Sequence, residues 1–350
     1  MRVVTRKQHL DFEAAQAAPL QAGKRLRVPS DLDALAALVT LNPAHGAFVD
    51  TLDILIRSTF RMTTLRRSLT LLPNLTDLIL IAPRIRSSSA LHGVYLPQLQ
   101  YFRTDLPHVI LVNFLTVHPA IVDLDLVGNG EHGGALQCPL QTVNLGGVRN
   151  LHGPAPCVVL LASQGLVRLT MQLDGSASSS SVPLRTIAPP LFDLHTLILD
   201  IQDDDFDILE SIAIACPRVR KLKLSEKALY KIQQNRRSQA RRAYNNAYAW
   251  SKALKKLPEL EELLLRTSTS LVRRPASWKD EHAVVTTWVN GRARMPSRAP
   301  LKPHPMLYHI GIWYGSGPFG GGCVTHWSKP SGTWERTVSI LNAPAHLPFI

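Results

Sequence analysis

Cysteine is scarce in this 350-residue chain, and its four cysteines show no metal-binding pattern. Cys138, Cys157, Cys216 and Cys323 are far apart, with no C-x-x-C pair and no cysteine–histidine spacing that forms a tetrahedral zinc site. Cys138 and Cys216 each stand directly before a proline, where a small buried hydrophobic residue fits. We therefore expect reduced thiols with structural roles, no bound metal and no cofactor.

Long apolar runs are also absent. No stretch approaches the roughly 18 apolar residues that span a bilayer. The first residues, Met1 to Lys7, lack the apolar core of a signal peptide. These absences predict a soluble intracellular protein of the cytoplasm or nucleus, without a membrane partner. We also expect a monomer.

Catalytic motifs are missing as well. The chain contains no G-x-S-x-G, no P-loop and no H-E-x-x-H sequence. Gly315 to Gly320 matches G-x-G-x-x-G, but Pro318 opposes the helix that should follow, and about thirty residues remain, too few for a βαβ unit. The sequence therefore predicts a protein that is not an enzyme.

Aromatic residues make up only 6% of the chain, and leucine-like residues in a repeated pattern take their place. The pattern is L-x-x-L-x-L, often preceded by a short turn that contains proline. Its clearest copies begin at Leu75, Leu194, Val219 and Leu260. Repetition of this pattern every 20 to 29 residues is typical of leucine-rich repeats.

The first apolar position of each copy sets the spacing of the repeat. It falls at Val49, Leu75, Leu99, Ile121, Leu140, Leu166, Leu194, Val219, Leu260 and Leu307. Seven intervals lie between 19 and 28 residues, which suits one strand and one return segment, whereas the last two are 41 and 47 residues. The long intervals indicate insertions.

The repeat predicts an α/β fold, a curved leucine-rich-repeat solenoid with a parallel sheet on its concave face and helices or irregular segments outside. We expect five segments along it. They are an N-terminal segment and cap helix (1–47), leucine-rich repeats (48–225), a basic helical insertion (226–256), last repeats with a basic loop at 266–302 (257–313), and a tail rich in Gly, Pro and Trp (314–350). The cap helix should run from Ser30, as N-cap, to Leu41, and a second clear helix should run from Asp203 to Cys216.

Positive charge is concentrated in one part of the chain. Residues 216–303 hold 21 Lys and Arg against 6 Asp and Glu, whereas the remaining residues hold 18 against 20. We expect one helix, longer than the others, across Ser225 to Leu257. Its cationic residues Arg236, Arg237, Arg241 and Arg242 form either a solvated face or an electrostatic contact with nucleic acid, an anionic membrane or an acidic partner. Arg266 to Lys302 should form a surface loop with one short helix.

Variable positions of the strands should face outward from the sheet and form the concave surface. The candidate partner-binding residues there are Asp77, Tyr101, Arg103, Asp123, Asp125, Asn144, Arg168, His195, Arg220 and Lys223. Their charge changes from acidic near Asp123 to basic near Lys223. This row is either a solvated sheet face or a protein-binding site.

Several stretches together resemble one family, the F-box proteins with irregular leucine-rich repeats that are abundant in basidiomycete fungi. They are Leu32 to Leu41 with Asn42-Pro43, Gly46 to Leu52, Leu72 to Leu78, Cys216 to Leu222, and Trp250 leading into Leu257 to Leu263. The resemblance covers residues 30–313. It implies the substrate receptor of a cullin-based ubiquitin ligase, in which an N-terminal F-box holds the adaptor and the repeats hold the target.

The N-terminal segment departs from that family. An F-box is about forty residues long in the family, and residues 1–29 are too short for it. We expect the adaptor-binding part to be missing or truncated, so that a cullin-ligase adaptor would bind only if an F-box lies upstream. The sequence thus leaves two functions: a protein-interaction scaffold of the F-box kind, or a nucleic-acid-associated scaffold that uses residues 227–256.

Overall fold

The computed structural model describes most of the chain. The described residues are 23–127, 138–173, 179–227, 242–267, 271, 278–291, 302–314, 322–330 and 332–341. The chain divides into two compact units, Met1–Gly147 and Val148–Ile350. The boundary falls within the segment for which the sequence predicts continuous repeats.

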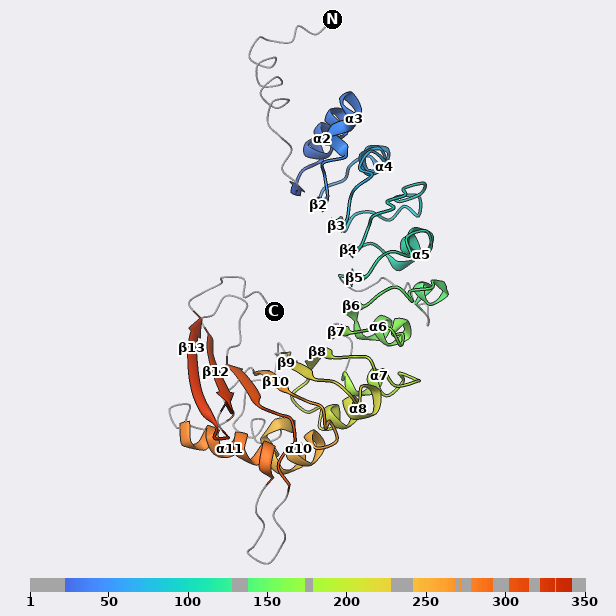
Figure 1. Ribbon diagram of the computed structural model, residues 1–350. Helices are drawn as coiled ribbons and strands as arrows, with labels where there is room; N and C mark the ends of the chain where they lie inside the picture. The colour runs from blue at the N-terminus through green and yellow to red at the C-terminus, as the bar shows by residue number, and fades with distance from the viewer. Residues whose placement is uncertain are drawn as a thin grey trace, which may run out of the picture. The chain divides into compact units, whose positions relative to one another are not determined.

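In each unit the described strands form an open sheet in which the strand order follows the sequence, from β1 to β5 in the first unit and from β6 to β13 in the second (Figure 1). Neighbouring strands are parallel from β1 to β5 and from β6 to β11. β12 and β13 add to this sheet as antiparallel strands. The predicted α/β class and its mostly parallel sheet are confirmed, and the leucine-rich-repeat identity stays a prediction.

The first unit places its core between the sheet and the helices. Its strands are β1 (Gly23–Leu26), β2 (Thr51–Leu55), β3 (Asp77–Ile81), β4 (Tyr101–Thr104) and β5 (Asp123–Leu126). Its helices are α2 (Pro29–Leu41), α3 (Pro43–Gly46), α4 (Met62–Thr70), α5 (His108–Thr116) and the 3-10 helix η1 (Pro139–Thr142). Leu52, Leu78, Phe102 and Leu124 lie in register and are buried. Because side chains alternate along a strand, the intervening residues point away from the helices.

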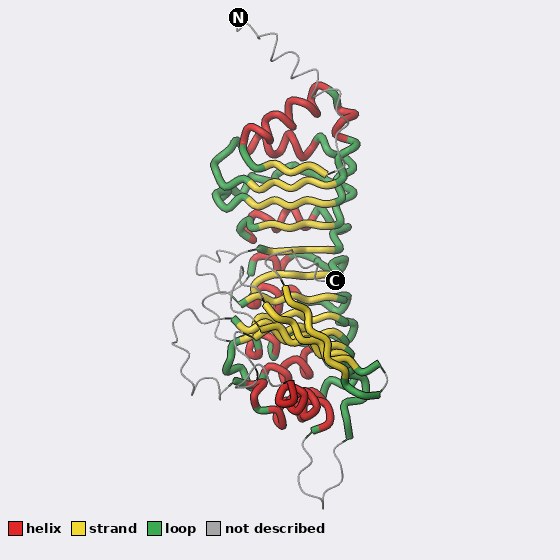
Figure 2. The backbone as a smooth tube through the Cα atoms, turned by 90° about the vertical axis from the view of Figure 1, so that its left-hand side faces the viewer, coloured by secondary structure: helices red, strands yellow, loops and turns green. Residues whose placement is uncertain are grey.

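The second unit follows the same plan. Its strands are β6 (Asn150–Pro154), β7 (Arg168–Gln172), β8 (Thr196–Ile201), β9 (Lys221–Glu226), β10 (Glu262–Thr267), β11 (His309–Tyr314), β12 (Gly322–Ser328) and β13 (Glu335–Leu341). Its helices are α6 (Ala155–Leu161), α7 (Ser181–Leu184), α8 (Ile208–Ala215), η2 (Ala243–Asn245), α10 (Ala247–Leu254) and α11 (Trp278–Asn290). In each unit the helices gather on one face of the sheet, as Figure 2 shows. None of the described helices is long and apolar enough to cross a bilayer.

One predicted strand is wrong. The copy of the repeat that begins at Leu140 lies in the 3-10 helix η1, and strand β6 begins ten residues later, at Asn150. Leu140 and Val143 are buried, since a spacing of three residues also places side chains on one side of a 3-10 helix. In the copy that forms β6, Val148, Leu151 and Gly153 occupy the apolar positions, and the glycine hides the pattern.

The basic insertion is not one long helix. Strand β9 continues to Glu226. Residues 228–241 lie outside the described part of the chain, which resumes at Arg242. A 3-10 turn precedes α10, and the Asn246 side chain caps α10 by accepting a hydrogen bond from the Ala249 amide, 3.2 Å away. The predicted helix across Ser225 to Leu257 is therefore wrong, because a strand occupies its beginning and a cap interrupts its second half.

Helix starts also differ from the prediction. α2 begins at Pro29, and the Asp31 carboxylate, not Ser30, accepts hydrogen bonds from the amides of Arg27 and Val28 at 3.0 and 3.2 Å. α8 begins at Ile208 instead of Asp203. α11 has 13 residues, so the predicted short helix is as long as α2. The sequence did not predict β1, β12 or β13.

Candidate interaction face

The face of the sheet opposite the helices carries most of the candidate residues. In the first unit, the outward positions of neighbouring strands pair in two rows. One row contains Thr51, Asp77, Tyr101 and Asp123, and the other contains Arg25, Asp53, Ile79, Arg103 and Asp125. The burial patterns of β2, β3 and β4 alternate between buried and partly exposed residues, so the outward residues of these three strands reach solvent.

Ion pairs connect neighbouring strands across the second of these rows. The Arg25 guanidinium lies 2.9 Å from the Asp53 carboxylate, and Arg103 lies 3.3 Å from Asp125. Asp125 is only 8% exposed, and half-buried Tyr101 lies beside this pair. Burial and the Asp125 carboxylate raise the pKa of Tyr101, and the Arg103 guanidinium partly offsets this rise. This part of the face therefore combines an aromatic ring with paired charges at fixed positions.

The second unit presents a more cationic face. Its outward positions include Arg168 on β7, Lys221 and Lys223 on β9, and Arg266 on β10. Lys221 is paired with Glu262 of the neighbouring strand at 3.0 Å. The remaining cations are half-buried. Their concentration on neighbouring strands makes this region a candidate binding site for negative charge.

The pKa of Lys223 reflects its burial and the charges around it. Burial, together with the charges of Arg266 and Arg168, lowers the pKa of Lys223 to about 8, whereas Asp200 opposes this shift. Asp200 also forms an ion pair with Lys227 at 2.9 Å and accepts a hydrogen bond from the Leu173 amide at 3.2 Å. The carboxylate that favours the charged form of Lys223 is therefore shared with other donors.

Apolar and aromatic groups border these cations. Leu264 pairs with Lys223 on one side and with Gly311 on the other. A Cβ atom at Gly311 would lie 2.5 Å from Leu264 Cδ2, so a side chain at this position would displace Leu264. On the far side of Gly311, His326 Nδ1 lies 3.2 Å from His309 Nε2, and the two rings stack. The lack of a side chain at Gly311 thus leaves room for the Leu264 side chain on this face.

Trp313 of β11 lies beside Arg266. The Arg266 guanidinium carbon is 4.5 Å from the centroid of the Trp313 ring, a cation–π geometry that holds the side chain in place. Neither residue is among the sequence-predicted site residues, because both follow the last apolar residue of their repeat copy. The first position after L-x-x-L-x-L still points outward in a strand, and this signal could have identified them.

The structure places the sequence-predicted residues in three groups. Asp77, Tyr101, Arg103, Asp123 and Asp125 lie on outward strand positions of the first unit, and Arg168 and Lys223 lie on those of the second. His195 and Arg220 are exposed and directly precede β8 and β9. Asn144 is wrongly predicted: it lies in the loop after η1, where its side-chain oxygen accepts a hydrogen bond from the Gly146 amide at 3.0 Å.

Arg242 does not belong to an exposed basic patch. Its side chain is only 4% exposed and pairs with the buried Glu226 carboxylate at 2.8 Å. Tyr244 donates a second hydrogen bond to Glu226, also at 2.8 Å. Arg242 therefore anchors the returning chain to the end of β9, because burying a carboxylate requires a partner charge. Arg236, Arg237 and Arg241 lie outside the described residues.

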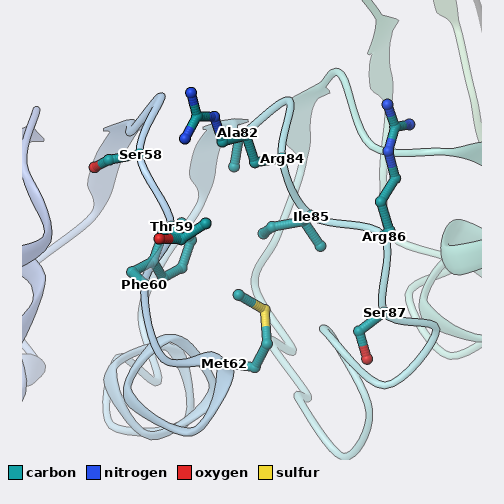
Figure 3. Close-up of a pocket in the computed structure, with 9 residues that line it drawn as sticks. All are labelled: Ser58, Thr59, Phe60, Met62, Ala82, Arg84, Ile85, Arg86 and Ser87. Carbon is teal, nitrogen blue, oxygen red and sulfur yellow. The ribbon is translucent and has the colours of Figure 1, made fainter.

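Among the described residues, recesses of the first unit lie away from the outward face. One, of about 270 Å³, is lined by the segments that follow β2 and β3, including Phe60, Met62, Arg84 and Arg86. In Figure 3 the guanidinium groups of Arg84 and Arg86 extend away from Met62. The other, of about 420 Å³, lies beside α5 and includes Tyr95 and Asn113. Both are open and shallow, and neither brings together a set of titratable residues.

A cysteine–histidine contact also occurs in the first unit. His108 Nδ1 lies 3.2 Å from Cys138 Sγ, and the two residues are 3% and 4% exposed. A nucleophilic thiol has to reach its substrate. Burial at both positions therefore favours a packing role for this pair.

The chain matches no protein-family model and no curated protein at a significant level of similarity. Its own residues therefore carry the functional interpretation.

Proposed function

We propose that this chain is a non-enzymatic interaction protein that binds a partner protein on the outward face of its sheet. The observation that carries the proposal is the kind of residue gathered there. Tyr, Trp and Arg are the residue types that contribute most to protein–protein binding energy. Outward strand positions present Tyr101 and Arg103 in the first unit, and Arg168, Arg266 and Trp313 in the second. Most of them are held by ion pairs or ring contacts, which reduces the entropy lost on binding.

A finer proposal concerns the kind of partner. The resemblance to fungal F-box proteins supports a role as the substrate-binding part of a ubiquitin ligase receptor. The partner on the outward face would then be the substrate, and a cullin adaptor would bind only through an F-box upstream of these residues. Capture of purified adaptor by the longest gene product tests this role, and no capture by that product would exclude it.

The general proposal is tested by photo-crosslinking at two tyrosines of the first unit. Tyr101 lies on the outward face, whereas Tyr95 is 62% exposed in a return segment beside the end of α5. A photoreactive phenylalanine derivative at either position makes a closely matched pair. We expect crosslinks to a partner from position 101 and few from position 95. Equal crosslinking from both, or none from position 101, contradicts the proposal.

A second candidate function is nucleic-acid binding through residues 227–256. It is favoured by the surplus of 15 positive charges in residues 216–303, the difference between 21 and 6. The described part of the insertion supports it weakly, because Arg242 is buried against Glu226 and Tyr244 and Trp250 pack in the core. Tyr244 and Trp250 are therefore unavailable for stacking on bases, whereas Tyr248 is 41% exposed.

A further inference from the structure

We propose that the outward face of the second unit binds an acidic segment of the partner protein at a cationic patch formed by Arg168, Lys223 and Arg266. This inference rests on the proposed function and names the chemistry of the partner. Three strands supply the patch: β7, β9 and β10. The strand register brings these strands together, since β9 pairs with β10 and is separated from β7 only by β8.

The arginines of the patch are not neutralised by the protein itself. Within the residues that the structure describes, neither Arg168 nor Arg266 forms an ion pair, although both are half-buried. The neighbouring carboxylates already serve other groups. Glu262 binds Lys221 at 3.0 Å and accepts a hydrogen bond from the Tyr308 hydroxyl at 3.2 Å, and Asp200 binds Lys227. A carboxylate supplied from outside would therefore gain attraction without breaking these pairs.

The surroundings of the patch favour a peptide over a nucleic acid. Ile198 and Leu264 flank Lys223 on the two neighbouring strands, so apolar side chains form the floor. Asp200 and Glu262 border the patch and would repel a continuous phosphate backbone. A peptide that alternates acidic and apolar residues satisfies both features, because its carboxylates meet the cations and its apolar side chains meet Ile198 and Leu264.

Binding at the patch should depend on pH. The pKa of Lys223 is about 8 in the unliganded protein, so the ammonium form is lost as pH rises from 7 to 9. A bound carboxylate favours the ammonium form of Lys223, so above pH 8 peptide binding is accompanied by protonation of Lys223. Affinity for an acidic segment therefore falls across this range, and this pH dependence belongs to Lys223, since arginine stays charged.

The experiment measures binding of a fluorescent peptide of alternating Glu and Leu residues to the full chain by fluorescence anisotropy. We expect Lys223→Gln and Arg168→Gln each to weaken binding roughly tenfold. Lys252→Gln, on the exposed surface of α10, removes the same charge from the helical side and should change affinity less than about twofold. Lys223→Arg should retain binding at pH 7 and abolish the weakening between pH 7 and 9.

Three outcomes overturn the inference. They are equal peptide affinity in wild type and Lys223→Gln, no pH dependence in the wild type, and tighter Lys223-dependent binding of a single-stranded oligonucleotide of the same charge. Thermal unfolding of each variant shows whether the fold is retained, and Lys223→Arg tests the site without removing charge. Crosslinking from position 101 together with a negative peptide result rejects this inference alone, whereas absence of crosslinking rejects the proposed function.

Discussion

Two buried histidines fasten return segments to the core through backbone hydrogen bonds. His118 Nε2 accepts a hydrogen bond from the Leu96 amide at 2.8 Å, and Nδ1 donates to the Phe114 carbonyl at 2.6 Å. His304 bonds the Leu257 carbonyl at 2.9 Å through Nε2 and the Leu307 amide at 3.0 Å through Nδ1. Both rings need one protonated and one unprotonated nitrogen, so each histidine works in its neutral form.

The protonation of these rings predicts how stability changes with pH. Burial lowers the pKa values of His118 and His304 from the ordinary 6.5, so the unfolded chain binds protons that the folded chain does not. Their contribution is fully present above pH 6.5 and is lost as the pH falls through the lower folded-state pKa values. We expect urea unfolding to show a lower free energy of unfolding at pH 5.5 than at pH 7.5.

His118→Phe tests the origin of this effect. The substitution leaves the buried Leu96 amide without its acceptor and should cost about 1–3 kcal/mol at pH 7.5. It should also reduce the pH dependence of unfolding, because one titrating group is gone. His92→Phe, at an exposed loop position, is the matched control and should change neither quantity appreciably. A pH dependence that is unchanged in His118→Phe would assign the effect to other groups.

At the scale of elements, one glutamate joins α11 to the last three described strands, β11, β12 and β13. Glu281 is 3% exposed and accepts hydrogen bonds from Tyr314 of β11 at 2.6 Å and from Trp327 of β12 at 2.7 Å. Arg336 of β13 lies 3.9 Å from the same carboxylate. A single side chain on α11 therefore contacts three consecutive strands.

This network predicts a specific loss of stability. Glu281→Gln keeps the shape of the side chain but leaves one oxygen acceptor for the two donors Tyr314 and Trp327. We expect the free energy of unfolding to fall by about 1–3 kcal/mol, measured by denaturant unfolding with tryptophan fluorescence. Asp280→Asn makes the same change at the neighbouring exposed position and should be nearly neutral. Equal losses of stability in the two variants would show that the hydrogen bonds of Glu281 do not stabilise the contact between α11 and the strands.

The elements also show what the sequence could predict. Strands whose copies contain two or three large apolar residues, such as β3 and β8, follow directly from the pattern, because burial on one face requires that alternation. β6 was missed because glycine occupies its last inward position, and β12 because Trp327 supplies its core contact without a leucine pattern. Arg103 and Lys223 were predicted from the same period, whereas the Glu281 network depends on a tertiary contact across 46 residues.

For the whole molecule, the net charge of +13 predicts nonspecific attraction to nucleic acids. Reversal of Arg236, Arg237 and Arg241 to glutamate lowers the net charge by six, to +7. Arg242 has to stay, because glutamate at that position would face buried Glu226 and unfold the region. We expect the triple variant to bind duplex DNA more weakly and with a shallower salt dependence, while partner crosslinking from position 101 is unchanged.

If the insertion is a nucleic-acid-binding site, the triple variant should behave differently. If nucleic acid is the partner of the insertion, the triple variant should lose its cellular ligand as well as its affinity for DNA. Measurement of DNA affinity between 50 and 200 mM salt, with the crosslinking yield from the same preparations, separates the two functions.

The strand order has a consequence for folding of the protein during its synthesis on the ribosome. Within each unit every strand pairs with its neighbour in the sequence, so a strand that leaves the exit tunnel always meets a partner that has already been synthesised. Paired residues are 24 apart between Asp77 and Tyr101 but 47 apart between Glu262 and His309. The longer closure costs only about 0.6 kcal/mol more, yet β11 carries the hairpin of β12 and β13. Growth of the sheet can thus begin long before translation ends, and the last step of its assembly waits for the second insertion to be completed.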